Sequence, residues 1–453
     1  MEKVLLERIY TEQEQSYISG LQELLRIKSV SADPDYEKDC LCCAEWLNAH
    51  LNKIGLQSTL LKTRTKPVVF ATYPGKPNHP VVSFYGHYDV QPVDPLELWE
   101  SDPFEPELRD GRLYARGAQD NKGQLFFFLK ALEALIAAQA LNCTVKVFIE
   151  GEEERGSGGI IEAAEGWKEQ LKSDILLVCD SGTRAAGVAT ITLGLRGMAG
   201  CSVRLIGPNK DLHSGMHGGV APNPATVLAQ LIASLHNADG SVAVEGFYDA
   251  VVKLDEGDRA LANKYFMDPA MYEKLVGIAP SGGEAGYTMA ERHCFRPTVE
   301  VNGMQSGYNG PGMKTIIPSV ATAKLSTRLV DQQEPEDALN KIIAHLKARV
   351  PEGLKLEESE RELAGPALRL SSNSALVQKA KGVLEEVSGG EVEVTWMGGS
   401  IPVVSTLVRV SGAEPLLVGF GVEEDNIHAP NESFLLSQFK QGFLYTGLFL
   451  SRL

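Results

Sequence analysis

The chain has 453 residues, 43% of them hydrophobic and 23% charged, which is enough for two or three domains with large buried cores. Its 43 Lys and Arg residues against 59 Asp and Glu residues give a net charge of −16 at pH 7. An acidic surface repels phosphate backbones and anionic lipids, so this balance argues against nucleic acid or a membrane surface as a partner. The length excludes a peptide hormone, a disulfide mini-scaffold and a single small binding module.

Nothing in the sequence predicts an export signal or a membrane span. The first residues mix acids and bases without an apolar run, and the most apolar stretch, residues 125–141, is interrupted by Lys130 and Glu133. The seven cysteines are an odd set without the paired C-x-x-C motifs of a zinc ribbon, which indicates reduced thiols rather than disulfides. We therefore expect a cytoplasmic protein.

The first 190 residues alternate helix and strand patterns, which is typical of an α/β sheet covered by helices. Helical spacing of apolar residues predicts helices around residues 43–54 and 125–136. Short apolar runs predict strands at residues 67–73, 81–85, 144–150 and 175–180.

From about Gly194 the pattern changes to a strand at 201–206 and two helices that begin at Pro224 and Pro335, with long polar and Gly-rich connections between them. The α/β rhythm resumes with a helix at 374–387, a strand at 415–420 and a last helix from Leu435. We therefore predict an α/β protein in which a mixed-sheet domain, formed by residues 1–192 and 369–453, carries an inserted α+β domain formed by residues 193–368.

Acidic residues and histidines follow several of these apolar runs directly. In an open α/β sheet the residues just past the carboxyl ends of the strands line the ligand crevice, so positions spread along the chain can converge there. A pair of divalent metal ions needs two His and three carboxylates, one of which bridges the ions. The residues that fit this set are His87, Asp120, Glu154, Asp180 and His428.

Two further acids are expected to support such a site. In an extended segment consecutive side chains diverge, so one of Glu153 and Glu154 can accept a proton while the other holds a metal. Asp89 lies two residues after His87 and on the same strand face, where its carboxylate can accept a hydrogen bond from the free ring nitrogen of His87. We interpret Glu152, in the same acidic run, as a solvated or hydrogen-bonded loop carboxylate without a catalytic role.

Five segments make the sequence resemble a known family. They are GHYDVQPVDPLELWESDPFEPELRDGRLYARGAQDNKGQ, EGEEERGSGG, DLHSGMHGG, WMGGSIPV and IHAPNES. Together they resemble the co-catalytic zinc metallopeptidases that include aminoacylases, glutamate carboxypeptidases and dipeptidases, and most of all the cytosolic nonspecific and carnosine dipeptidase branch. The resemblance runs nearly end to end.

The resemblance implies a role for each candidate residue of the metal site. Asp120 would bridge two ions, one held also by His87 and Asp180 and the other also by Glu154 and His428. Zinc would be the usual metal, although manganese and cobalt suit the same donors. The general base would be Glu153, with Asp89 beside it.

The resemblance also implies that the inserted domain is a lid that mediates a homodimer. His213 in this lid would reach the partner's active site and stabilise the oxyanion. Arg328, Ser400 and Gly399 would hold the substrate carboxylate.

The predicted activity is that of a two-metal exopeptidase, which hydrolyses the amide bond of dipeptides or short peptides with a metal-activated hydroxide and a Glu base. Two alternatives stay open. An N-acyl amino acid deacylase, of the acetylornithine deacetylase or succinyl-diaminopimelate desuccinylase type, would use the same metals. A catalytically silent homologue would bind peptides without turnover.

Overall fold

The structure is a computed structural model that describes residues 1–453. It forms two compact units, the first comprising residues 1–193, 370–395 and 406–453 and the second comprising residues 194–369 and 396–405. The second unit is therefore inserted into the first. The predicted boundaries place residues 396–405 in the first unit, whereas the structure groups them with the second. Within that unit, the carbonyls of Gly398 and Gly399 accept hydrogen bonds from Arg196.

A mixed sheet of nine strands has the order β1-β2-β6-β3-β7-β17-β8-β15, and β16 also pairs with β8. At its centre β3 runs parallel to both β6 and β7, and β7 runs parallel to β17, whereas β2 is antiparallel to β6. The strands span Gln57–Leu61 (β1), Val68–Tyr73 (β2), Val81–His87 (β3), Thr144–Glu150 (β6), Ile175–Val178 (β7), Ala189–Leu195 (β8), Leu368–Arg369 (β15), Val392–Met397 (β16) and Glu414–Gly419 (β17). The strands predicted from short apolar runs are confirmed.

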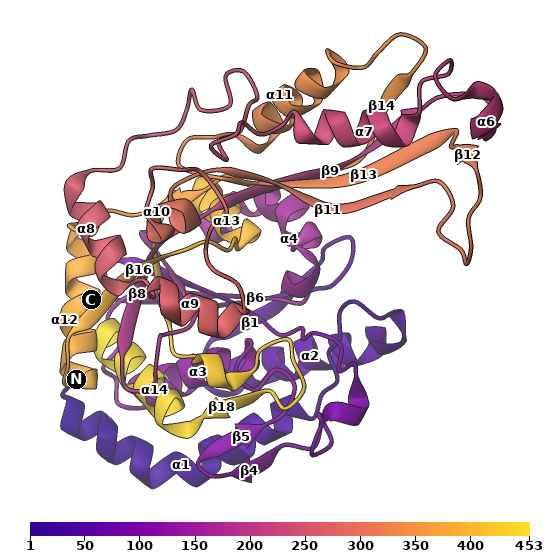
Figure 1. Cartoon of the computed structure of the whole chain (residues 1–453). Helices are drawn as coiled ribbons and strands as arrows, with labels where there is room; N and C mark the ends of the chain where they lie inside the picture. Colours follow the sequence, from indigo (N-terminus) through magenta and orange to yellow (C-terminus); the bar gives the residue numbers. More distant parts are fainter. The chain divides into compact units, whose positions relative to one another are not determined.

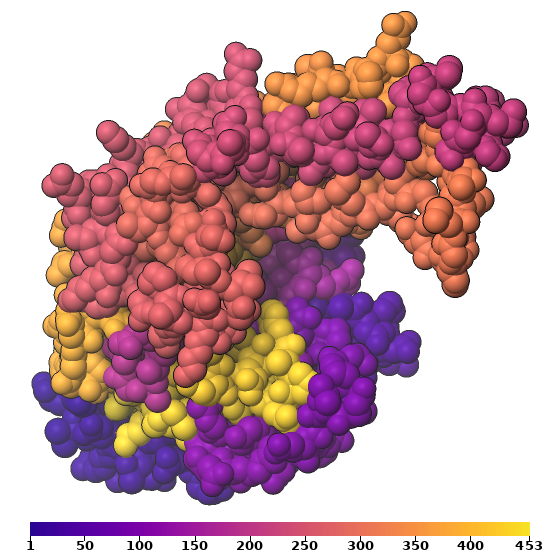
Figure 2. All heavy atoms as spheres, in the orientation of Figure 1, coloured from indigo at the N-terminus to yellow at the C-terminus, as the bar shows by residue number.

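Helices of the first unit pack on this sheet and on one another. The two ends of the chain meet here, because α14 packs against α1 and α3, and Figure 2 shows the C-terminal segment (yellow) next to the N-terminal one (indigo). Aromatic side chains fill the contact, with the rings of Tyr10 and Phe443 5.4 Å apart. The helices span Lys3–Leu25 (α1), Glu37–Lys53 (α2), Lys122–Ala137 (α3), Gly158–Ala163 (α4), Lys168–Leu171 (α5), Ala375–Ser388 (α12) and Leu436–Ser451 (α14), and α13 (Pro402–Ser411) begins in residues of the second unit and ends in residues of the first.

The second unit is built on a four-stranded antiparallel sheet of order β11-β13-β9-β14. Helices α7 and α11 lie along the same face of this sheet (Figure 1), and alternate residues of β13 are buried because that face packs against the helices. The strands span Gly197–Ile206 (β9), Thr298–Ser306 (β11), Val320–Leu329 (β13) and Lys355–Gly365 (β14), and the helices span Pro224–Ala233 (α7) and Pro335–Lys347 (α11).

The segment between α7 and α11 is more regular than the sequence predicts. Where the sequence analysis expects long polar connections, three short helices form, α8 (Glu256–Tyr265), α9 (Pro269–Val276) and α10 (Met289–Cys294). Each begins at a side chain that accepts a hydrogen bond from the first helical turn, namely Asp255, Asp268 and Thr288. These caps stabilise helices whose apolar periodicity is too short to stand out among Gly and Pro residues.

Several small elements complete the chain. A two-stranded pair joins β10 (Leu212–His213) to β12 (Ile316–Ile317), next to the single-turn helix α6 (Ser214–His217). A three-stranded sheet joins β4 (Glu107–Arg109), β5 (Arg112–Tyr114) and β18 (Ser433–Leu435). None of the helices combines the length and the apolar character that a membrane span requires.

Candidate metal centre

Five of the predicted side chains converge in the first unit. The ligand atoms of His87, Asp120 and Asp180 all lie within 4.8 Å of one another, and so do those of Asp120, Glu154 and His428. Asp120 belongs to both groups. Its Oδ1 lies 3.1 Å from Nε2 of His87 and its Oδ2 lies 2.9 Å from Nε2 of His428, so its two oxygens face the two histidines separately.

The topology of the sheet explains part of this convergence. His87 is the last residue of β3, and Asp180 follows the neighbouring parallel strand β7, so both lie at the carboxyl edge of the sheet. Glu154 lies in a single 3₁₀ turn, Glu153–Arg155, just after β6. Asp120 precedes α3, and His428 lies in the loop before β18 with a left-handed backbone (φ 61°).

The electrostatics show that this group of acids attracts positive charge. Burial disfavours a charged His87, but its hydrogen bonds to Asp120 and Asp180 outweigh burial and raise its pKa well above the ordinary value. Hydrogen bonds to Asp120 and Glu154 raise the pKa of His428 to about 10. For Asp120, burial opposes the charge, yet the hydrogen bonds from His428 and His87 hold its pKa below the ordinary value.

The donor set fits divalent metal ions. Imidazole nitrogens together with carboxylate oxygens suit zinc, manganese and cobalt, and one carboxylate shared by two groups is the arrangement of a two-metal site. His87 can bind a metal through Nε2, because its Nδ1 donates to the main-chain carbonyl of Asp89 at 3.1 Å and the neutral ring then carries its lone pair on Nε2.

Asp89 contacts His87 through its main chain as well as through the predicted side chain. The hydrogen bond of His87 goes to the main-chain oxygen of Asp89, and the carboxylate Oδ1 lies 3.4 Å from Nδ1. The carboxylate also accepts three other hydrogen bonds, from Ser31 Oγ at 2.6 Å and from the backbone N–H groups of Glu153 and Glu154, each at 3.2 Å. Asp89 therefore fixes both the histidine and the glutamate turn.

The glutamate run also differs from expectation in its backbone. Glu153 and Glu154 are not in an extended segment but in the 3₁₀ turn, and only Glu154 belongs to a ligand group. Burial, opposed by His87 and reinforced by Asp180 and Glu154, raises the pKa of Glu153 to about 9. Glu152 is buried and accepts from Thr65 Oγ1 and Gly159 N, which confirms a hydrogen-bonded loop carboxylate.

Two further residues support the ligands without belonging to the predicted site. Gln91 Nε2 donates to Glu154 Oε2 at 2.7 Å, and Asn121 Nδ2 donates to Asp180 Oδ1 at 2.8 Å. Each lies one or two positions from a residue that the analysis had selected. Their position next to predicted site residues is the only indication in the sequence that these amides support the site. The sequence does not show toward which carboxylate an amide side chain points.

Comparison with known proteins identifies the family of the chain. Residues 83–452 match the description Peptidase family M20/M25/M40. The chain belongs to this family of metallopeptidases. The M20 family metallo-carboxypeptidase Sso-CP2 from Sulfolobus solfataricus is 33% identical, with a TM-score of 0.85 over 96% of this chain and 98% of that chain.

Two relatives match this M20/M25/M40 peptidase along nearly its whole length. The Beta-Ala-His dipeptidase of Rattus norvegicus is 26% identical over 442 residues, which is 95% of this chain and 87% of the rat protein. The Cys-Gly metallodipeptidase dug1 of Schizosaccharomyces pombe is 27% identical over 464 residues, which is 97% of this chain and 96% of that protein.

The second unit of the peptidase contains the residues that were predicted to bind a carboxylate. Arg328, on β13, donates from Nη1 to Ser400 Oγ at 2.8 Å, and Ser400 in turn donates to the main-chain oxygen of Arg196. Gly399 accepts from Arg196 N at 3.0 Å. No acidic side chain pairs with Arg328, whose pKa is lowered by burial, so its guanidinium is available to an anion.

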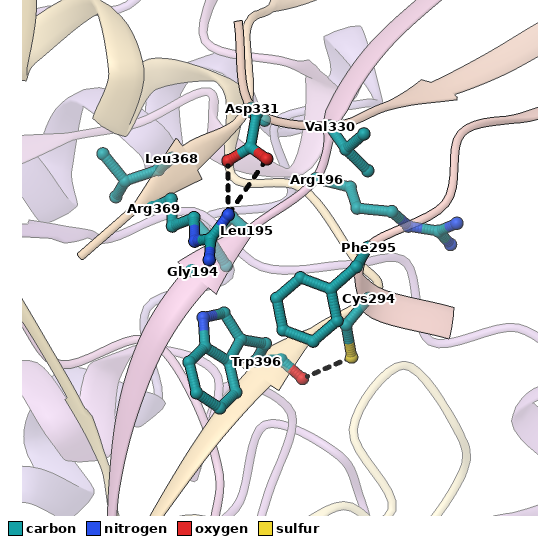
Figure 3. A pocket seen from close by; sticks show the side chains of 11 residues that line it. Gly194, Leu195, Arg196, Cys294, Phe295, Val330, Asp331, Leu368, Arg369 and Trp396 are labelled. Carbon is teal, nitrogen blue, oxygen red and sulfur yellow. Dashed lines mark hydrogen bonds and ion pairs between the residues drawn. The ribbon is translucent and has the colours of Figure 1, made fainter. Parts of the chain in front are cut away.

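Asp331, which could have neutralised Arg328, is bound elsewhere. Figure 3 shows Arg369 pointing at Asp331, with Nη1 3.1 and 3.3 Å from the two carboxylate oxygens. These residues line a cavity of about 10 Å³, the space of one water molecule. Because Asp331 and Asp258 both pair with Arg369, these three side chains offer no free charge to a ligand.

His213 of the peptidase lies on β10 in the second unit and is exposed. Its Nδ1 accepts from the backbone N–H of Gly215 at 3.1 Å. A neutral ring in this arrangement carries its proton on Nε2, which is then free to donate a hydrogen bond.

Proposed function

We propose that this metallopeptidase is a dipeptidase, an exopeptidase that hydrolyses the amide bond of dipeptides and short peptides. The observation that carries the proposal is the pair of ligand groups joined at Asp120, with Glu153 beside them. The full-length similarity to proteins named as Beta-Ala-His and Cys-Gly dipeptidases supports this substrate class.

The five ligand residues would hold two divalent ions, for which zinc is our first assignment and manganese or cobalt the alternatives. When bound, such ions polarise a carbonyl group and make a water molecule more acidic. His87 and Asp180 would hold one ion, Glu154 and His428 would hold the other, and Asp120, which belongs to both groups, would contribute to both.

Glu153 is assigned as the general base. Two bound cations would lower the pKa that burial raises, so that the Glu153 carboxylate can accept a proton from the attacking water and then donate it to the nitrogen of the leaving amine. The turn Glu153–Arg155 is fixed by Asp89, whose carboxylate accepts from two of its backbone N–H groups, so the base keeps its place during the reaction.

Arg328, Ser400 and Gly399 are assigned to the free carboxylate at the end of the substrate. An arginine whose hydrogen-bond partner is a hydroxyl retains donors for a carboxylate, and the Ser400 side chain fixes its direction. Recognition of this carboxylate would limit the enzyme to the last peptide bond. We also propose a cytoplasmic location, since all seven cysteines are free thiols and six are buried.

The deciding experiment is hydrolysis of a matched substrate panel by metal-free protein refilled with Zn²⁺ or Mn²⁺. The panel is Cys-Gly, β-Ala-His, Ala-Gly, Ala-Gly amide, N-acetyl-Ala-Gly, N-acetyl amino acids and Gly-Gly-Gly. We expect metal-dependent cleavage of the free dipeptides and at least about tenfold lower kcat/KM for the amide, which lacks the charge that Arg328 binds. Cleavage of the acylated compounds alone would make the protein a deacylase, and no turnover with two ions bound would make it a silent homologue.

His213 is assigned to the oxyanion of the partner subunit's active site, which requires a homodimer. His213→Ala is expected to lower kcat by about 10²-fold or more, the usual loss for an oxyanion donor. A mixture of His213→Ala and Glu153→Ala chains should then regain activity, because each mixed dimer contains one intact combination. Subunit exchange is verified by mass spectrometry. If activity does not recover in the exchanged mixture, the active site is self-contained within one chain.

A further inference from the structure

Glu432 is a buried carboxylate that the proposed chemistry does not use. It is 0% exposed and lies four residues after His428, just before β18. Its Oε2 accepts from Arg116 Nη1 and from the backbone N–H of Gly117, both at 2.8 Å. Its Oε1 accepts from the backbone N–H groups of Gln119 and Asp120, both at 3.1 Å.

These contacts join two ligand-bearing segments that lie far apart in the sequence. Glu432 and Asp120 are 312 positions apart, yet the side chain of one holds the main chain of the other. Asp120 contributes to both ligand groups, whereas His428 contributes to one. A shift of the Asp120 main chain would therefore move a shared oxygen donor relative to both histidines.

The loop that contains His428 needs such an anchor. Asn426, His428 and Asn431 all have left-handed backbones, with φ values of 55°, 61° and 62°. Left-handed non-glycine residues are costly and persist where surrounding contacts hold them. Glu432 supplies contacts at the end of this loop, and its own main-chain oxygen accepts from Ala115 N at 3.1 Å.

The chemistry of the contact requires a carboxylate. Four N–H donors share the two oxygens of Glu432, and the charge of Arg116, itself 1% exposed, compensates the buried anion. A glutamine has only one oxygen, so either orientation of its amide would place an NH₂ group against two N–H donors. The site therefore discriminates between two side chains of nearly the same shape.

We propose that Glu432 is a positioning residue for the metal centre, which fixes the Asp120 segment and the His428 loop together before either ion binds. The proposal rests on the two-metal site of the proposed function. Residues that orient metal ligands in this way typically change metal affinity by about 10 to 100-fold when they are replaced.

The test is the affinity of the purified, metal-free protein for Zn²⁺, measured in competition with a chromophoric chelator. Glu432→Gln is expected to weaken both binding steps by about 10-fold or more. Glu291→Gln is the matched control, because Glu291 in α10 is also buried, pairs with Arg259 at 2.8 Å and accepts from Thr288 N at 2.9 Å. The control should bind zinc like the wild type.

Wild-type protein that fails to bind two ions would overturn the proposed function and, with it, this inference. Two ions bound by both wild type and Glu432→Gln with equal affinity would overturn the inference alone. If the variant does not fold, the proposal is tested by hydrogen exchange of the wild-type protein in its metal-free form. The backbone amides of Gly117, Gln119 and Asp120 should be strongly protected, and fast exchange at these amides in folded protein would contradict the proposal.

Discussion

Glu153→Gln is expected to lower kcat by about 10² to 10⁴-fold while two metal ions remain bound per chain, as is usual for the loss of a general base. The amide keeps the shape of the side chain but cannot accept the proton of the attacking water. Metal binding should survive because Glu153 belongs to neither ligand group. Single-turnover hydrolysis of the preferred dipeptide, with metal content measured on the same sample, gives both quantities.

The neighbouring Glu152 provides a matched control for this prediction. Its carboxylate accepts from Thr65 Oγ1 and Gly159 N, so it belongs to the loop rather than to the ligand groups. Glu152→Gln should therefore keep kcat within a few-fold of wild type. If Glu153→Gln lost metal while Glu152→Gln did not, Glu153 would be a ligand and the assignment of the two adjacent glutamates would have to be exchanged.

The part of the site that could be predicted from sequence is the part fixed by the sheet. His87 and Asp180 follow apolar runs that become β3 and β7, and parallel neighbouring strands bring their carboxyl ends to one edge. Strand position alone therefore placed these two residues together. Asp120 and His428 follow no strand of this sheet closely, and they were predicted as ligands because two metal ions need a bridging carboxylate and a second histidine.

What could not be predicted is the direction of individual hydrogen bonds. The predicted contact of the Asp89 carboxylate with His87 is present at 3.4 Å, but the shorter hydrogen bond of His87 goes to the Asp89 carbonyl, and the carboxylate also accepts from the turn of Glu153 and Glu154. Both arrangements satisfy the same spacing rule. The choice depends on how the chain turns after β6, a backbone detail that no residue pattern specifies.

Contacts between segments far apart in the chain could not be predicted from the sequence either. Glu432 lies in the segment IHAPNES, and only the folded chain brings it within hydrogen-bond distance of Asp120. In the second unit, helices α8, α9 and α10 were missed because each spans few turns, so the capping residues carry more signal than the apolar periodicity.

Asp120→Asn is expected to weaken binding of both metal ions and to abolish detectable turnover. Its two oxygens face His87 and His428 separately, and an amide can offer an oxygen to only one of these sides while presenting NH₂ to the other. The variant also loses the negative charge that both ions share. The affinity loss should exceed the roughly 10 to 100-fold typical of residues that only orient ligands. Metal titration of the folded variant measures it.

Asp180→Asn separates a shared ligand from an unshared one. Asp180 belongs only to the group that contains His87, so this variant should lose affinity for one ion and keep the other. A metal titration of Asp180→Asn should therefore show two binding steps of unequal affinity. In Asp120→Asn, by contrast, the affinity of both steps should fall. If Asp120→Asn instead kept one ion at wild-type affinity, Asp120 would serve a single ion, and the two ligand groups would be independent sites that happen to be close.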